Sequence, residues 1–441
     1  MKILCGSLLT YTDDPFLSDE GAARHEIHGA IAVDGGRIVA VGDEDTVMAQ
    51  LPPEQRNRAV VVRHPGCLLM PGMIDAHLHP PQMEILGSPA PELVDWLTRH
   101  AFPAETKYND PDYAKMMAEA CLDEMLRNGT TTACAFGTVH PCSADALFTA
   151  ATARNVRIIA GKVAMDRNAP PELLDTAQST YDDAHRLIDR WHGRGRCEYA
   201  LTPRFVPACS HEEMEAIGAL AKEHPDIVVQ SHISETVAEV EWVKSLCPDS
   251  TSYAQVYDRY GLLRPRAVYA HGVHLAEAEL SLFADRGAAV IHCPSSNLFL
   301  GSGLFDIRQA KRPDRLVQVG LGSDVGAGTS FSLLQTLGDA YKVAQLRHGA
   351  LTGLEACYLA TLGSARSLGI DDKVGRLAPG LEADIIALDT QATPLLALRC
   401  AQTACLDELL HVLMTLGDDR AVRAVYVAGE LWEPPLHEHC E

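Results

Sequence analysis

Five residues of types that bind metal ions stand at the ends of short apolar runs spread along the sequence. His77 and His79 close the run MIDAHLH, His232 lies in DIVVQSHIS, His271 in AVYAHG, and Asp324 ends VQVGLGSD. Neutral imidazole and carboxylate groups are ligands of zinc. His77 and His79 are two residues apart, so their side chains point to the same side of an extended chain. Taken singly, each residue could be an ordinary polar group at a strand end, but together they predict a metal site.

The runs that contain these residues belong to a longer series. Eight strand-like runs alternate with segments of helical length, which is the pattern of successive βα units. The runs cover residues 73–79, 130–136, 157–166, 198–205, 226–234, 267–272, 288–293 and 317–324. The helical segment 111–129 ends at Gly129, a typical helix stop. Eight units over about 300 residues suit a (β/α)8 TIM barrel, in which active sites lie at the carboxyl ends of the strands.

The two ends of the chain show a different pattern. Residues 28–43 alternate apolar residues around Asp34-Gly35-Gly36, which indicates a β-hairpin. Residues 380–389 and 421–432 are again strand-like. We therefore predict an α/β protein with a small β-sandwich domain formed from both chain ends. Its two parts are expected at residues 1–66 and 376–441, with the barrel at 67–375.

The composition limits the partners. The 441 residues have a formal net charge of −22, which does not favour nucleic acid or an anionic membrane as a partner. No segment approaches the roughly 18 apolar residues of a membrane-spanning helix. Thirteen cysteines without a C-x-x-C pair predict reduced thiols in a cytoplasmic protein. The tail HEHCE at 437–441 groups potential ligands, but a chain terminus has nothing to preorganise them.

The motifs resemble a known family. Residues 71–79, PGMIDAHLH, followed by His232, His271 and Asp324, resemble the amidohydrolase superfamily in content and order. The segments NGTTTACAFGTVH (128–140), TPRF (202–205), HCPSSNLFLGSGL (292–304) and LGSDVGAGTSF (321–331) are similar to the guanine deaminase family within it. The similarity covers essentially the whole chain. It implies a zinc-dependent aminohydrolase that acts on cyclic amidines and converts guanine to xanthine and ammonia.

The resemblance also implies roles for the candidate ligands. His77, His79, His232 and Asp324 are expected to bind one Zn²⁺ per chain, although Fe²⁺ or Mn²⁺ would also suit these ligands. The metal lowers the pKa of a bound water to about 7, and the resulting hydroxide attacks C2 of guanine. His271 is expected to orient this hydroxide rather than to bind a second metal. Asp324 is expected also to accept the water proton.

Glu235 is the predicted general acid, because it follows His232 by three residues on the rim of the same barrel mouth. It would relieve the charge that develops on N3 and then pass its proton to the leaving amino group. The structural alternative is a carboxylate at a helix N-terminus, stabilised by the helix dipole.

The resemblance further implies a set of contacts to a purine substrate. An amide side chain suits the edge of a 6-oxopurine, and an arginine can donate to its O6 carbonyl. As alternatives, Arg204 could be half of a buried ion pair and Phe205 could belong to the core. The predicted substrate contacts are Gln82, Arg204, Phe205, His232, Glu235 and Asp324.

Several rival functions differ in their chemistry. Dinuclear amidohydrolases bridge two metals with a carboxylated lysine at the end of strand four, where this chain has Thr-Pro-Arg-Phe, so one metal is predicted. A deaminase of 8-oxoguanine, a pterin or a triazine stays an alternative. A non-catalytic scaffold is expected to lack one of the ligands, yet all five positions and Glu235 are present. Deaminases of polynucleotides use H-x-E with P-C-x-x-C, which forms no such site here. The resemblance implies a homodimer.

Overall fold

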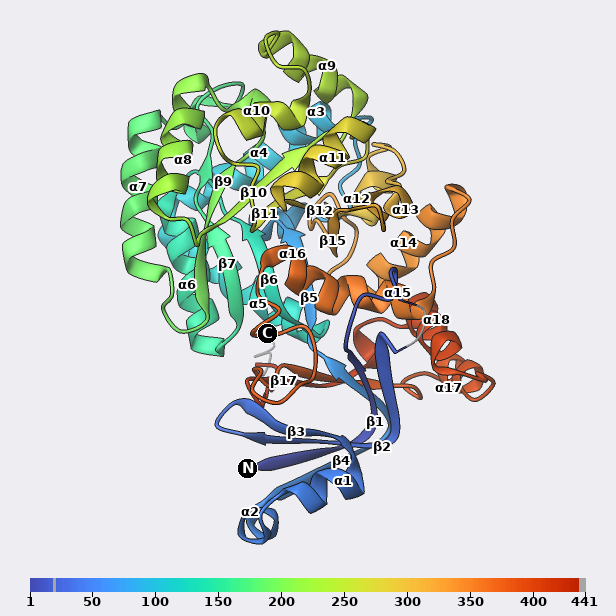
Figure 1. The fold of residues 1–441 in the computed structure, drawn as a ribbon. Coiled ribbons are helices and arrows are strands. Elements are labelled where there is room, and N and C mark those ends of the chain that lie inside the picture. Colours follow the sequence, from blue (N-terminus) through green and yellow to red (C-terminus); the bar gives the residue numbers. More distant parts are fainter. Residues whose placement is uncertain (19–20, 436–441) are drawn as a thin grey trace, which may run out of the picture.

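The computed structural model describes residues 1–18 and 21–435 of the chain. Eight parallel strands form a sheet that curves into a barrel (Figure 1). They are β5 (Met73–Leu78), β6 (Thr130–Phe136), β7 (Arg157–Gly161), β9 (Cys197–Pro203), β10 (Val228–Ile233), β11 (Ala267–His271), β12 (Ala289–His292) and β15 (Gln318–Leu321). The short strand β8 (Val163–Ala164) pairs with β9 outside this order. Each of the eight predicted runs overlaps one barrel strand, although β9 begins one residue before its run, and the predicted (β/α)8 barrel is confirmed.

The first and last strands of the barrel, β5 and β15, are not joined by a regular series of backbone hydrogen bonds. Among the described strands, β15 pairs with β12 on one side, and β5 pairs only with β6. Two backbone hydrogen bonds join the free sides just beyond β15. Asp324 N–H donates to the His77 carbonyl at 2.8 Å, and His79 N–H donates to the Val325 carbonyl at 2.6 Å. The segments that contain three of the predicted metal ligands are thus bonded directly to each other.

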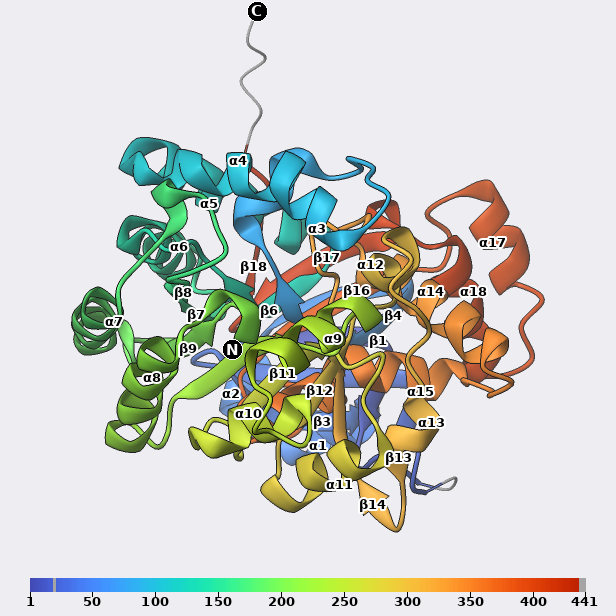
Figure 2. The same cartoon turned by 90° about the horizontal axis from the view of Figure 1, so that it is seen from above.

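Helices cover the outside of the barrel, and Figure 2 shows α6, α7 and α8 lying outside β7 and β9. The signals that begin and end a helix are visible in α5, where the Asp110 side chain accepts a hydrogen bond from Asp112 N–H and Pro111 occupies the first position. The chain leaves α5 through Gly129 at φ +82°, which is the predicted helix stop. The main outer helices are α5 (Pro111–Arg127), α6 (Pro141–Arg154), α7 (Ala177–Trp191), α8 (His211–Glu223), α9 (Val237–Leu246), α10 (Tyr253–Arg259), α11 (Glu277–Arg286), α14 (Leu333–Leu346) and α15 (Gly353–Tyr358). The short helix α16 (Ser364–Leu368) instead packs against the other face of the strands.

Shorter helices lie in the loops and at the small sheet. Two of them, α3 (Leu93–Trp96) and α4 (Phe102–Thr106), follow β5, and α12 (Pro294–Phe299) follows β12. Two others, α17 (Pro394–Cys400) and α18 (Leu406–Leu416), follow the C-terminal strand β16. The remaining short elements are α1 (Glu44–Gln50), α2 (Pro53–Arg58), α13 (Ile307–Ala310), β13 (Lys311–Arg312) and β14 (Arg315–Leu316).

The barrel strands contribute to two buried clusters on opposite sides of the sheet. On β6, Ala133 and Ala135 pack in the large cluster that also contains α5 and α6 residues, whereas Cys134 packs in a smaller cluster. The smaller cluster joins residues of β5, β7, β9 to β12 and α16. This alternation is the period of two expected for strands that are covered on both faces.

The strands at the two chain ends form one continuous seven-stranded sheet, which Figure 1 shows below the barrel. The predicted hairpin joins β2 to β3 through Gly35 and Gly36, both at positive φ. Strand β4 continues to Pro71, so the predicted boundary at residue 66 falls within a strand, and the domain boundaries stay a prediction. In order across the sheet, the strands are β18 (Glu430–Leu431), β17 (Val422–Val427), β16 (Ile385–Asp389), β4 (Val60–Pro71), β1 (Lys2–Tyr11), β2 (Ala23–Asp34) and β3 (Arg37–Asp43). The predicted small β domain from both ends is confirmed.

Buried ion pairs connect the amino ends of the barrel strands to the small domain. Arg157, the first residue of β7, donates to both carboxylate oxygens of Glu382, at 3.1 and 2.5 Å. Arg196, just before β9, donates to Glu382 at 2.9 Å and to Asp384 at 2.5 Å. These contacts lie at the opposite ends of β7 and β9 from the predicted site.

The composition led to expectations about membrane-spanning helices and about the cysteines, which can be compared with the described residues. No helix among them has the length and apolarity needed to cross a membrane. All of the described cysteines are free thiols. The HEHCE tail at 437–441 lies outside the described residues.

Candidate active site

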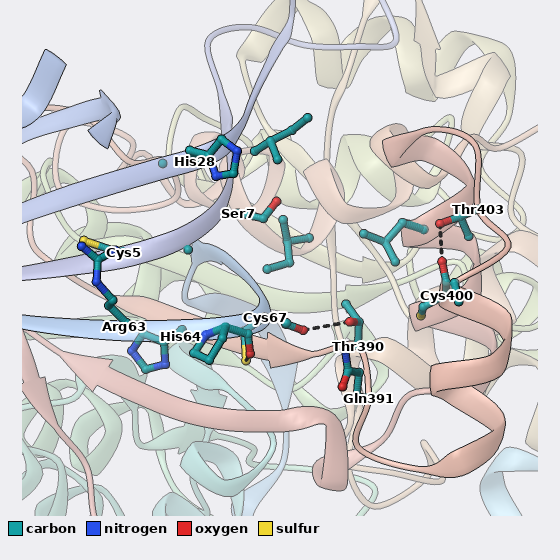
Figure 3. A pocket seen from close by; sticks show the side chains of 18 of the residues that line it. Cys5, Ser7, His28, Arg63, His64, Cys67, Thr390, Gln391, Cys400 and Thr403 are labelled. Atoms are coloured by element: carbon teal, nitrogen blue, oxygen red, sulfur yellow. Dashed lines mark hydrogen bonds between the residues drawn. The ribbon is translucent and has the colours of Figure 1, made fainter. Parts of the chain in front are cut away.

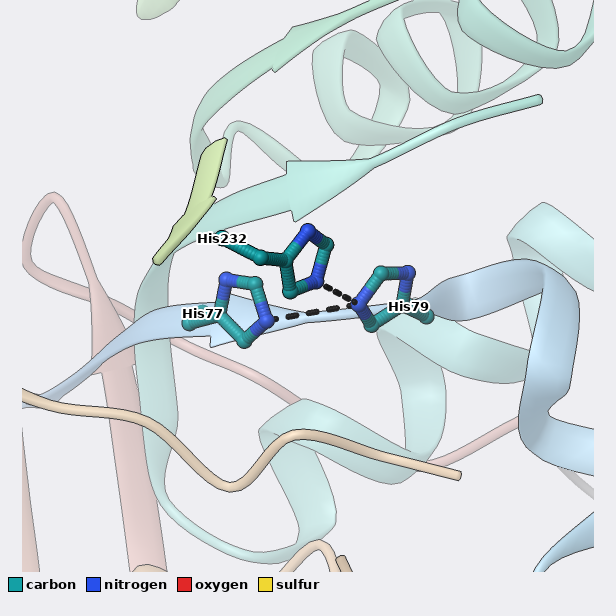
Figure 4. A group of neighbouring side chains, drawn as sticks. All are labelled: His77, His79 and His232. Carbon is teal, nitrogen blue, oxygen red and sulfur yellow. Dashed lines mark hydrogen bonds between the residues drawn. The ribbon is translucent and has the colours of Figure 1, made fainter. Parts of the chain in front are cut away.

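The predicted metal ligands lie together at the carboxyl ends of the barrel strands. Nε2 of His79 is 3.3 Å from Nε2 of His77 and 3.2 Å from Nε2 of His232 (Figure 4). Oδ1 of Asp324 is 3.2 Å from Nε2 of His77 and 3.4 Å from Nε2 of His79. Ligand atoms at zinc-bond lengths around a tetrahedral ion stand about 3.3 Å apart. His77, His79 and His232 form one group able to hold a metal ion, and His77, His271 and Asp324 form a second group that shares His77. The donor distances given above suit a zinc ion.

The protonation states of this cluster also suit a cation. Nδ1 of His232 lies 2.5 Å from the Arg204 carbonyl oxygen and donates its proton to it, which leaves Nε2 free to bind. Burial lowers the pKa of His77, His79 and His232, so these imidazoles are neutral. Burial alone would raise the pKa of Asp324, but the hydrogen bond from His77 and the neighbouring histidines lower it overall. Neutral imidazoles beside a carboxylate are the forms that bind a metal ion.

His271 lies beside the cluster with different partners. Its Nδ1 is 2.9 Å from Oδ1 of Asn297, and its Nε2 is 3.5 Å from Oε2 of Glu235 and 3.9 Å from Oδ2 of Asp324. Burial lowers the pKa of His271, but Glu235 and Asp324 raise it overall. Burial also raises the pKa of Glu235 to about 7. A carboxyl group with a pKa of about 7 and a histidine with a raised pKa thus face the cluster from one side.

Glu235 is held so that its carboxyl group faces the cavity. Ser302 Oγ donates to Glu235 Oε1 at 2.9 Å, and Glu235 N–H donates to Glu239 Oε2 at 2.8 Å. The capping box of α9 is made by Thr236 and Glu239. The carboxylate that stabilises the first turn of α9 is therefore Glu239, and the side chain of Glu235 is left to the site.

Two site residues, and Ser234 next to Glu235, have unusual backbone conformations. Ser234, His271 and Asp324 have φ of +49°, +75° and +53° and belong to the eight non-glycine residues with positive φ in the described chain. Each such conformation costs on the order of 1–3 kcal/mol. Strain of this kind concentrates at functional sites, because there the position of a side chain matters more than local stability.

A cavity opens beside the cluster, and the residues predicted to contact the substrate line it. The only predicted site residue outside its lining is His77, which contacts His79 and Asp324 instead. The lining consists of His79, Gln82, Leu93, Trp96, Leu97, Arg204, Phe205, His232, Glu235, Glu239, His271, Leu300, Asp324 and Ala327. The structure thus brings all the predicted site residues together at one end of the barrel.

Sequence reasoning missed the residues that support this site. Arg204 Nη1 donates to Glu105 Oε2 at 2.7 Å, so Arg204 both lines the cavity and belongs to a buried ion pair. Asp75 accepts hydrogen bonds from the backbone N–H groups of His77 and Ser323, at 3.2 and 3.0 Å, and joins β5 to the loop after β15. A signal existed for both carboxylates, since Glu105 ends the apolar stretch AFPAE and Asp75 lies among the apolar residues of MIDA.

A larger cavity, of about 520 Å³, lies in the small domain beside β1, β4 and α17 (Figure 3). Its lining includes His28, His64 and Cys67. One hydrogen bond across it runs from Thr390 Oγ1 to the Gly66 carbonyl at 2.8 Å. None of the predicted site residues lines it, and the groups of described residues able to hold a metal lie at the barrel mouth.

Comparison with known proteins agrees with this geometry. Residues 68–432 match the model of the amidohydrolase family, and residues 29–52 match an imidazolonepropionase-like composite domain of bacteria. A guanine deaminase of Escherichia coli K12 is 46% identical over 433 residues, which cover 98% of this chain and 97% of that protein. A solved structure of E. coli guanine deaminase has a TM-score of 0.94 at 45% identity and covers 99% of this chain and 100% of its own.

Two further solved structures have informative ligands. Guanine deaminase from C. acetobutylicum, with guanine bound in its active site, has a TM-score of 0.87 at 30% identity, covering 98% of this chain and 100% of its own. An adenosine deaminase from Xanthomonas campestris, with zinc bound, has a TM-score of 0.84 at 26% identity, covering 97% of this chain and 92% of its own.

Proposed function

The chain belongs to the amidohydrolase family and, within it, to the guanine deaminases, and we propose that it hydrolyses guanine to xanthine and ammonia. The observation that supports this most is the arrangement at the barrel mouth. Three of the proposed metal ligands, a carboxyl group with a raised pKa, and the donor wall of Gln82 and Arg204 border one buried cavity. The fourth proposed ligand, His77, contacts His79 and Asp324.

The family is metal-dependent, and we propose that one Zn²⁺ ion binds to His77, His79, His232 and Asp324. The donor spacing and the neutral imidazoles described above support zinc, which is also bound in the related adenosine deaminase. Fe²⁺ or Mn²⁺ would suit the same ligand types. A bound zinc ion supplies hydroxide at neutral pH by lowering the pKa of water to about 7.

The side chains around C2 are proposed to move the protons of the reaction. Asp324 accepts the proton of the attacking water, and His271, whose Nε2 lies 3.9 Å from Asp324 Oδ2, orients the nucleophile. As the C2–O bond forms, Glu235 protonates N3 of the ring. The proton of the new C2 hydroxyl then passes through the Glu235 carboxylate to the 2-amino group, so the C2–N bond breaks, ammonia leaves and the 2-oxo group forms. The proton held by Asp324 returns to Glu235, which restores both carboxyl groups.

The walls of the cavity are proposed to hold the purine ring. Arg204 donates to O6, and Gln82, which can donate and accept, contacts the adjoining amide-like edge. Phe205, which is 9% exposed and packs edge-on against Trp242 with ring centroids 6.0 Å apart, lines the imidazole side. His232, Glu235 and Asp324 complete the proposed contacts around the reacting carbon.

Two statements about context belong to the same proposal. We propose a cytoplasmic location, which is supported by the free thiols of the described cysteines. We also propose a homodimer, on the resemblance to the family alone.

A substrate panel tests the function. Ammonia release is measured with guanine, 8-oxoguanine, adenine and isoxanthopterin, and the metal content of the purified protein is determined in parallel. We expect guanine to give the highest kcat/KM, with about one metal per chain. Negligible guanine turnover beside good turnover of another ring would replace guanine with that substrate, and a protein without stoichiometric metal or turnover would be a scaffold.

A further inference from the structure

Glu105 connects the two side chains that form the donor wall of the cavity. Gln82 Nε2 donates to Glu105 Oε1 at 2.8 Å, and Arg204 Nη1 donates to Glu105 Oε2 at 2.7 Å. All three side chains are buried, with 2–3% of their surface exposed. Glu105 belongs to α4 and is not itself part of the cavity lining. It therefore acts on a ligand only through Gln82 and Arg204.

These contacts fix which way the Gln82 amide faces. Its Nε2 donates to Glu105, while its Oε1 accepts a hydrogen bond from Gly326 N–H at 3.3 Å. In the reversed orientation, the amide oxygen would face the Glu105 carboxylate and the amide NH₂ would face the Gly326 N–H. Both of those contacts are repulsive, so the amide has one orientation.

The fixed amide leaves a defined pattern for a ligand. One N–H and one oxygen lone pair of Gln82 remain, in a set order, and the guanidinium of Arg204 can only donate. The O6 and N1–H edge of a 6-oxopurine presents an acceptor beside a donor. A 6-aminopurine presents the reverse, an amino donor beside an N1 acceptor. A wall with a fixed donor and acceptor order distinguishes these two edges strongly, since the wrong edge leaves buried polar groups unpaired.

We propose that Glu105 is a positioning residue that determines selectivity at position 6 of the purine, favouring a 6-oxo over a 6-amino ring. This inference rests on the proposed function, because it assumes that the purine edge faces Gln82 and Arg204. Glu105 holds the amide of Gln82 in one orientation and the guanidinium of Arg204 in one place.

The test compares two purines that differ only at position 6, guanine and 2,6-diaminopurine. For the wild type and Glu105→Gln, we measure kcat and KM for guanine and the competitive inhibition constant of 2,6-diaminopurine, which is informative whether or not this ring is turned over. In Glu105→Gln we expect the KM of guanine to rise about tenfold or more, since a charged hydrogen-bond partner is lost. The kcat should change far less, and the inhibition constant of 2,6-diaminopurine should stay unchanged or fall.

The matched control is Asp14→Asn, which removes the charge of another buried carboxylate. Asp14 pairs with Lys311 at 2.7 Å, and both side chains are 1% exposed. This variant should lower the thermal midpoint without changing the ratio of the two purines. Equal weakening of both purines in Glu105→Gln, or no change in either, would overturn the inference. A wild type that does not deaminate guanine would instead contradict the proposed function.

A second pair of variants keeps the inference testable if Glu105→Gln folds poorly. Gln82→Glu places two carboxylates face to face, so it should lower the thermal midpoint strongly in the presence of Glu105. The double variant Gln82→Glu, Glu105→Gln restores a donor opposite an acceptor and should recover most of that loss. If Gln82→Glu is equally destabilising with either residue at position 105, the contact that carries the inference is not formed.

Discussion

Burial has opposite effects on the two kinds of side chain that meet at the barrel mouth. Removing the histidines from water favours their neutral form, which can bind a cation. The same removal favours the protonated form of a carboxyl group, and the pKa of Glu235 rises to about 7. The same exclusion of water thus favours neutral imidazoles that can bind a metal ion on one side of the cavity. On the other side it favours a protonated carboxyl group that can donate a proton.

Glu235→Gln is expected to lower kcat by about 10²–10⁴-fold, because an amide cannot deliver a proton to N3 or to the leaving amino group. The metal content should stay unchanged, since Glu235 is not among the proposed ligands. Both are checked by ammonia release and metal analysis of the same preparation. Glu241→Gln, an exposed carboxylate on helix α9, which follows Glu235, is the control and should retain full activity. A Glu235→Gln enzyme within tenfold of the wild type would contradict the role of general acid.

The residues of the site differ in how well they could be predicted. The histidines and Asp324 were predictable because each ends a strand, and the rule that barrel sites lie at strand ends locates them together. Glu105 obeys no such rule, because its position depends on contacts with Gln82 and Arg204 that are distant in sequence. Asp75 lies on a strand, but its bonds to the loop after β15 depend on how the barrel closes.

At the scale of elements, short apolar runs between helical segments predicted all eight barrel strands, since strands covered on both faces are apolar along their length. The segment between β5 and α5 was harder. Its short helices α3 and α4, joined by a π-helical turn at Leu97–Ala101, have no regular apolar period. This segment between β5 and α5 supplies Trp96 and Leu97 to the cavity lining. The sequence pattern that predicts secondary structure is therefore weakest in a segment that forms one wall of the cavity.

A buried carboxyl group between α7 and α8 is expected to make stability depend on pH. Glu213 is fully buried, accepts a hydrogen bond from Thr180 Oγ1 at 2.6 Å, and burial raises its pKa to about 7 from an ordinary value of 4.5. The folded state therefore keeps a proton that the unfolded chain releases near pH 4.5. The resulting stabilisation is complete below that pH and is lost as the pH rises through about 7.

Glu213→Gln should remove this dependence. Relative to the wild type, the variant should gain up to about 3 kcal/mol in the free energy of unfolding between pH 4.5 and pH 8. Urea unfolding at both pH values measures the difference. Glu215→Gln, on the exposed face of α8, is the control and should show no such gain. A constant difference between Glu213→Gln and the wild type at the two pH values would show that Glu213 titrates normally.

At the scale of the whole molecule, the site and the contact between the two domains lie at opposite ends of the barrel. Glu382 of the small domain bonds to Arg157 and Arg196 at the amino ends of β7 and β9. The catalytic groups lie at the carboxyl ends. Stability and chemistry should therefore respond to mutation independently at these two ends.

Glu382→Ala is expected to cost about 2–3 kcal/mol of unfolding free energy, because Arg157 and Arg196 both lose charged hydrogen bonds to Glu382. Each guanidinium keeps one carboxylate partner, Glu198 for Arg157 and Asp384 for Arg196. Asp258→Ala removes half of a more exposed pair with Arg286 and should cost less than about 1 kcal/mol. Urea unfolding measures both values. The kcat per folded molecule should stay at the wild-type level in each variant, and a large fall in kcat for Glu382→Ala would contradict this separation.

The seven-stranded sheet has a consequence for the newly synthesised chain. Strand β4 pairs on one side with β1 and on the other with β16, through residues 67–71 and 385–389. At translation rates of about 5–20 residues per second, β16 is made roughly 15–60 s after β4. Until then, the apolar edge CLLMP of β4 has no partner, and unpaired apolar edges are sites of aggregation. The chain still on the ribosome is therefore exposed to aggregation at this edge until β16 has been made.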